Sequence, residues 1–146
     1  CVNFGTPISM RGYLGERSLD LRRLSKEERA VHLERLGAEL MERIGQMIPA
    51  LPVPLEASVL VESAGEPLSE LELKARTFRL MTELENAGAH VYIPRRDQDY
   101  AIVAGLRMLT LRHLIEEREG LYAAVPGEMT LLRYYAGSIG HLMPIT

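Results

Sequence analysis

The sequence predicts a mainly α-helical fold with two or three short strands. Two serines are each followed three residues later by a glutamate, Ser25 by Glu28 and Ser69 by Glu72, which is the capping box that begins many helices. Apolar residues recur at helical spacing after both boxes. The β-prone runs are short by comparison, so helices should form most of the structure.

Residues 1–4 are apolar and β-prone, and Gly5-Thr6-Pro7 follows them as a turn signal. A lone strand needs neighbours for its hydrogen bonds, so we expect its sheet to precede residue 1. The sequence also begins with Cys1 and not with Met, which is typical of a piece of a longer chain. We therefore assign residues 1–9 to the last strand and turn of a preceding domain, and residues 10–146 to a helical C-terminal region.

Three helices are expected in the first two thirds of this region. The first begins at Lys26 and ends before Pro49, and five of its apolar residues should form one inward-facing stripe. These residues are Leu33, Leu36, Leu40, Ile44 and Met47. The second helix covers residues 55–64, although ASVLV would also suit a buried strand. The third covers residues 70–87 and ends at Gly88.

The remaining elements are two strands and two helices. Strands are expected at residues 90–93 and 121–125, and they should pair across a helix that Asp97 caps and that continues to about Arg118. A Pro-Gly break then precedes the last helix. Its Ala136, Gly137 and Gly140 form a small-residue face, which we expect another element to approach closely.

Composition excludes several classes of function. The net charge of −3 and the pI near 5.8 argue against a nucleic-acid-binding surface, which relies on an excess of Lys and Arg. The single Cys1 excludes an internal disulfide and a cysteine-rich zinc site. No apolar run approaches the roughly 20 residues of a membrane span. We expect the fragment itself to be soluble.

No catalytic, cofactor-binding or metal-binding constellation stands out. Ser138 and His141 share a helical face, but no acidic residue nearby would orient the histidine, so an interface is the preferred interpretation. The four histidines share no ligand spacing. Arg95 and Arg96 are a weak signal for phosphate binding. The helices between residues 55 and 93 also suggest a winged helix, but the acidic third helix, residues 70–87, would be repelled by DNA phosphates.

Both ends of the sequence resemble one family. CVNFGTPISM is similar to the VNFGEP segment of bacterial membrane-associated glycerol-3-phosphate acyltransferases, and LLRYYAGSIGHLM is similar to their YYxNxIAH helix. Thr6 replaces the usual Glu and Gly137 replaces a frequent Asn. We treat seven matching positions as a structural signature, and nothing in the sequence assigns substrate contacts to them: Asn3, Gly5, Pro7, Tyr134, Tyr135, Ser138 and His141.

The resemblance implies acyl transfer from acyl-CoA or acyl carrier protein to glycerol 3-phosphate, which gives lysophosphatidate for phospholipid synthesis. It places the whole enzyme peripherally on the cytoplasmic face of the inner membrane. The family's catalytic His-x4-Asp motif is absent, because the residues five positions after His32, His90 and His113 are Gly, Arg and Arg.

We therefore expect a region that contains no cofactor, is inactive alone, braces an upstream acyltransferase domain of the same chain and shapes the acyl-donor entrance. The alternative is a stand-alone helical or winged-helix-like interaction module unrelated to lipid synthesis.

Overall fold

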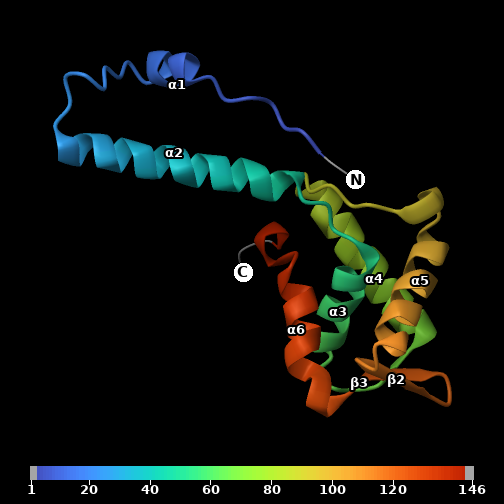
Figure 1. The fold of residues 1–146 in the computed structure, drawn as a ribbon. Coiled ribbons are helices and arrows are strands. Elements are labelled where there is room, and N and C mark those ends of the chain that lie inside the picture. The colour runs from blue at the N-terminus through green and yellow to red at the C-terminus, as the bar shows by residue number, and fades with distance from the viewer. Residues whose placement is uncertain (1–2, 144–146) are drawn as a thin grey trace. The chain divides into compact units, whose positions relative to one another are not determined.

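The computed structural model describes residues 3–143, within which the chain forms six α-helices and one three-stranded antiparallel sheet (Figure 1). The predicted mainly helical fold class is confirmed. The chain divides into two compact units, Cys1–Ile48 and Pro49–Thr146. Each unit has its own packing.

The first unit contains two helices, α1 (Met10–Glu16) and α2 (Lys26–Met47). The Ser9 side chain caps α1, which the sequence analysis did not predict. The predicted capping box of α2 is present in full. The Ser25 hydroxyl accepts a hydrogen bond from the Glu28 backbone N–H at 3.1 Å, and the Glu28 carboxylate accepts one from the Ser25 N–H at 2.8 Å.

The strand expected at residues 1–4 stays a prediction. Cys1 and Val2 lie outside the described residues, and Asn3 and Phe4 belong to no helix or strand of the structure. The sheet that this strand would join was expected before residue 1. The domain boundary predicted after residue 9 also stays a prediction, because the sheet of the first domain was expected before residue 1.

The second unit contains four helices and all three strands. Its helices are α3 (Pro52–Glu62), α4 (Glu70–Asn86), α5 (Gln98–Leu111) and α6 (Met129–Gly137). The strands are β1 (Leu68–Ser69), β2 (Ile115–Arg118) and β3 (Leu121–Ala124), and β3 lies between the other two. Three short 3₁₀ turns complete the unit: η1 (Pro94–Arg96), η2 (Pro126–Glu128) and η3 (Gly140–Leu142).

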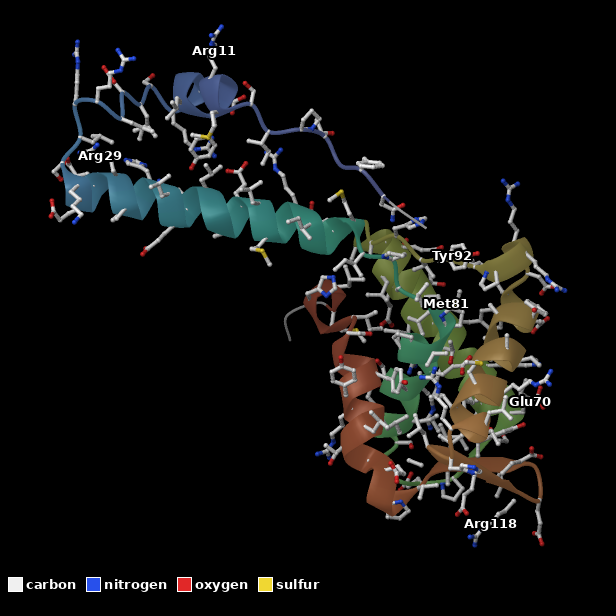
Figure 2. All side chains as sticks on the ribbon, viewed as in Figure 1. Arg11, Arg29, Glu70, Met81, Tyr92 and Arg118 are labelled. Carbon is white, nitrogen blue, oxygen red and sulfur yellow. The ribbon has the colours of Figure 1, made fainter. Side chains whose placement is uncertain are left out.

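Helix α3 forms the centre of this unit and packs against α4, α5 and α6. Every residue from Pro54 to Leu60 is buried, as expected for a helix that is apolar on almost all sides. Leu60 belongs to a larger apolar cluster with residues of α4, α5 and α6. Leu55 belongs to a second cluster that includes Met81, labelled in Figure 2. The helix interpretation of residues 55–64 is therefore confirmed over the strand alternative.

The helix predicted from the Asp97 cap to about Arg118 is confirmed as far as Leu111 and is wrong beyond it. Helix α5 ends at Leu111, His113 adopts a left-handed backbone with φ of 57°, and residues 115–118 form strand β2. Glu119 and Gly120 then connect β2 to β3, with φ of 53° and 78°. Two residues of positive φ give a turn whose twist matches a hairpin, so pairing with β3 overrides the helical propensity of the segment.

The strand expected at residues 90–93 is also wrong. Val91 makes only an isolated parallel bridge to Ala50, and the expected pairing across the helix does not form. Strand β3 pairs instead with β1 at Leu68–Tyr122 and with β2 along its whole length. The short β1 was missed because its two residues carry no alternating pattern.

The second unit has the element order of a winged helix, namely α3, β1, α4, α5, β2 and β3 with β3 in the middle of the sheet. In this element order, α5 occupies the position of the helix that would enter a DNA groove. The sequence had instead suggested residues 70–87, which form α4, for that position. The β2–β3 hairpin carries Glu116, Glu117 and Glu119 beside Arg118, labelled in Figure 2. Such charges repel phosphates, and the expected absence of nucleic-acid binding stays a prediction.

Candidate functional site

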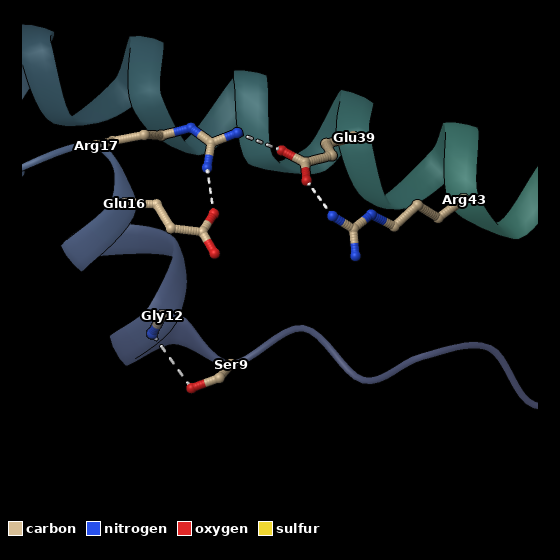
Figure 3. A network of polar contacts seen from close by, with 6 residues as sticks. All are labelled: Ser9, Gly12, Glu16, Arg17, Glu39 and Arg43. Atoms are coloured by element: carbon tan, nitrogen blue, oxygen red, sulfur yellow. Dashed lines mark hydrogen bonds and ion pairs between the residues drawn. The ribbon is translucent and has the colours of Figure 1, made fainter.

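A chain of charged side chains holds α1 against α2 in the first unit (Figure 3). Arg17 Nη2 lies 2.8 Å from one carboxylate oxygen of Glu39, and Arg43 Nη2 lies 2.6 Å from the other. The Arg17 guanidinium also lies over the Tyr13 ring, 4.0 Å from its centroid. A carboxylate shared by two arginines fixes both partners, so this side of α2 is already occupied within the unit.

The three signature residues near the N-terminus contact the C-terminal end of α2. The Asn3 side-chain amide donates to the Met47 carbonyl at 3.0 Å. A Cβ at Gly5 would lie 2.5 Å from Met47 Sδ, so the glycine permits a close approach of the chain. Pro7 lines a groove of about 470 Å³ between this segment and α2. These contacts are local to the first unit, and the role of the three residues as a structural signature stays a prediction.

The apolar stripe of α2 is largely exposed, contrary to the inward-facing prediction. Only Leu36 of the expected stripe is buried. Leu33 retains 56% of its surface exposed, Leu40 retains 40% and Ile44 retains 45%. Met41, on the same side by helical spacing, is 67% exposed. We call these four residues, Leu33, Leu40, Met41 and Ile44, the α2 stripe.

An exposed stripe of this kind is unusual. Soluble proteins scatter single apolar residues over their surface but rarely align them along a helix. Phe4, in the segment that contacts the end of α2, is 92% exposed as well. The helical periodicity of α2 was readable from the sequence, whereas the lack of a partner within the first unit was not.

The C-terminal signature residues lie in α6 and just after it. Tyr135 is partly buried against the larger apolar cluster, and the Arg112 guanidinium donates to its hydroxyl. Tyr134 packs edge-on against Tyr135 but is 75% exposed. The Ser138 hydroxyl donates to the Tyr135 carbonyl at 2.7 Å, so its proton is not directed at His141 in η3. This arrangement suits packing and not a nucleophile with its base.

The small-residue face of the last helix is open, contrary to expectation. Ala136 packs against the larger cluster, but Gly137 and Gly140 are exposed. Apart from chain neighbours and the backbone of the same helix, no heavy atom of residues 3–143 lies within 4 Å of a Cβ built on either glycine. The helix ends at Gly137, so Gly140 belongs to the following turn. The apolar side of the segment is packed, with Leu132 and Ile139 buried.

One buried acid was missed by the sequence analysis. Glu56 of α3 is fully buried, and neither carboxyl oxygen has a hydrogen-bond partner among residues 3–143. Burial raises the pKa of Glu56 to about 9, so the group is protonated at neutral pH. It faces Gly105 of α5, where an added Cβ would lie 2.7 Å from Glu56 Cδ. The signal was a single acid within the otherwise apolar run VPLEASVLV.

Neither a metal site nor a membrane span was found in the part of the chain that the structure describes. Over residues 3–143, no three His, Cys, Asp or Glu side chains are grouped so that they could hold a metal ion. Within the same range, no helix combines the length and the apolar character that a membrane span requires.

Comparison with known families gives a match over nearly the whole sequence. The model described as "Glycerol-3-phosphate acyltransferase C-terminal region" matches residues 1–145. No curated protein and no solved structure matches the chain. The match includes both segments in which the sequence resembles the acyltransferases, and it favours that interpretation over an unrelated interaction module.

Proposed function

Because the chain belongs to the family of the glycerol-3-phosphate acyltransferase C-terminal region, we propose that it braces the catalytic domain of such an enzyme. The enzyme would transfer an acyl group from acyl-CoA or acyl carrier protein to glycerol 3-phosphate. The catalytic residues would lie before residue 1, and this region would be inactive alone. Attachment to the cytoplasmic face of the inner membrane, through the rest of the enzyme, belongs to the same proposal.

The observation that carries the proposal is the exposed α2 stripe. Burial of a leucine-sized side chain contributes roughly 1.5–3 kcal/mol, so four such residues favour a partner strongly. The partner we commit to is the upstream acyltransferase domain. Asn3 donates to the carbonyl of Met47, which is close in sequence to Ile44 at one end of the stripe. An acyltransferase domain that precedes Asn3 would therefore be tethered near the surface that it would cover.

Substitutions on the stripe test this docking in the full-length enzyme. Leu33→Ser combined with Met41→Ser removes the two most exposed residues of the stripe, neither of which lines the groove beside Pro7. We expect a lower melting temperature and lower acyltransferase activity of the full-length enzyme. In the isolated 146-residue chain, the same change should leave the melting temperature nearly unaltered, because exposed positions contribute little to stability.

Val31→Ser is the matched control, because Val31 is 55% exposed on α2 but lies off the stripe by helical spacing. Val31→Ser should change neither the melting temperature of the isolated chain nor the melting temperature and activity of the full-length enzyme. The docking would be contradicted if the full-length enzyme with both stripe substitutions kept its melting temperature and its activity. Destabilisation of the isolated chain by those substitutions would show that another part of the same chain covers the stripe, which would also contradict it.

Inactivity of the region alone is tested by incubating the isolated chain with acyl-CoA and glycerol 3-phosphate. No lysophosphatidate should form, because no His-x4-Asp motif is present in the sequence. Turnover that persists after repeated purification would mean that the chain contains a catalytic site of its own.

A further inference from the structure

The second unit contains a pocket of about 900 Å³ between α4 and α5. Phe78 of α4, the connecting segment and the first turn of α5 line it. Figure 1 shows this connection as the yellow segment that leads from the end of α4 to α5. A volume of this size is in the range of small-molecule sites, roughly 300–1,000 Å³.

Two adjacent arginines supply positive charge to the pocket. Arg95 and Arg96 both line it, and both adopt a left-handed backbone, with φ of 57° and 54°. This conformation costs a residue with a side chain about 1–2 kcal/mol. No ion pair joins either guanidinium to a carboxylate within residues 3–143. The charge of both groups is therefore available to a ligand.

The two acids of the pocket have partners within the protein. Asp97 accepts a hydrogen bond from the Tyr100 backbone N–H at 3.0 Å and so caps α5. Asp99 lies 3.8 Å from the Lys74 ammonium. The Arg95 guanidinium stacks 4.2 Å from the centroid of the Tyr100 ring, which orients it while its N–H donors stay free.

Aromatic rings form another part of the pocket. Tyr92, labelled in Figure 2, is 43% exposed and lines the pocket together with the partly buried Phe78. An exposed ring offers a flat surface on which a base can stack, and guanidinium groups match the geometry of phosphate oxygens. The pocket thus combines the two recognition elements that a nucleotide requires.

We propose that this pocket binds a nucleotide, with its phosphates on Arg95 and Arg96 and its base against Tyr92. The site goes beyond the docking role of α2, because it lies wholly in the second unit and uses none of the stripe residues. Its test measures ligand affinity, so its failure is distinguishable from a failure of the docking.

Calorimetric titration of the full-length protein with ADP tests the site. ADP should bind, and Arg95→Gln with Arg96→Gln should weaken binding by roughly tenfold or more for each charge-assisted contact that is lost. Arg107→Gln with Arg133→Gln is the matched control, because both arginines are exposed in the same unit and neither lines the pocket. The control should bind ADP with unchanged affinity. Thermal melts of all variants establish that they are folded.

Further titrations distinguish a nucleotide from a simple phosphate. Tyr92→Ala should weaken ADP binding and leave binding of inorganic phosphate unchanged. Absence of ADP binding, or ADP binding that the double arginine variant does not weaken, would overturn the proposal. Binding of inorganic phosphate or glycerol 3-phosphate as tight as that of ADP would overturn it too, because the aromatic wall would then have no role.

Discussion

At the scale of single residues, the burial of Glu56 should make the free energy of unfolding depend on pH. Its pKa in the folded protein is about 9, raised by burial from an ordinary value of 4.5. At a pH between these two pKa values, Glu56 keeps its proton in the folded state and loses it in the unfolded state. The free energy of unfolding should therefore fall as pH rises from about 4.5 to about 9, by at most about 1.4 kcal/mol per pH unit.

Glu56→Gln should flatten this dependence, because the amide has nearly the same shape and does not ionise. Denaturant unfolding of the isolated chain at several pH values measures the slope. Glu62→Gln, at an exposed position on the same helix, is the control and should keep the steep dependence. Equal slopes for the native chain and Glu56→Gln would show that Glu56 is not buried in its neutral form.

Gly105 is needed because Glu56 occupies the space beside it. Gly105→Ala should reduce the free energy of unfolding by about 1–3 kcal/mol, since the added methyl group would press on the carboxyl group of Glu56. Gly137→Ala should be neutral or stabilise by up to about 1 kcal/mol, because space is open there and alanine favours helix. Thermal unfolding compares the two variants, and equal effects would contradict the contact at Gly105.

At the scale of elements, the capping boxes were the most predictive feature of the sequence. The starts of α2 and α4 were both predicted to the residue, because Ser25 with Glu28 and Ser69 with Glu72 form local hydrogen bonds. The hydrogen bonds that Glu72 accepts from Ser69 lower the pKa of its carboxyl group. Such signals depend on residues three apart and need no knowledge of the rest of the fold.

Loss of one cap has a predictable effect on α4. Ser69→Ala should destabilise the chain by about 1 kcal/mol, because the Glu72 backbone N–H loses its acceptor. Ser69→Thr keeps a hydroxyl and should recover most of the loss. Urea unfolding gives the comparison, and an alanine variant as stable as the native chain would mean that the cap contributes nothing.

Elements that depend on distant partners were harder to predict. Residues 115–118 have a helix-favouring composition, IEER, and become a strand only because β3 folds back through Glu119 and Gly120. The periodicity of α2 predicted an apolar stripe correctly but could not show that the first unit leaves it exposed. Likewise Glu56 is an ordinary helical glutamate in the sequence, and only the packing of α5 against α3 reveals its burial.

At the scale of the whole molecule, the two units differ in how complete they are. The second unit encloses two apolar clusters and the buried residues Pro54 to Leu60 of α3. Among its described residues, the first unit buries the large apolar side chains of Tyr13 and Leu36 and exposes the stripe and Phe4. This difference is what we expect if the first unit completes its packing against the acyltransferase domain and the second unit folds independently of it.

Hydrogen–deuterium exchange along α2 tests this account most directly. Peptides covering residues 26–47 should exchange more slowly in the full-length enzyme than in the isolated chain, because docking of the stripe opposes local opening of the helix. Peptides from α3 should exchange alike in both and serve as the internal reference. Equal exchange of α2 in the two proteins would contradict the claim that this helix docks on the catalytic domain.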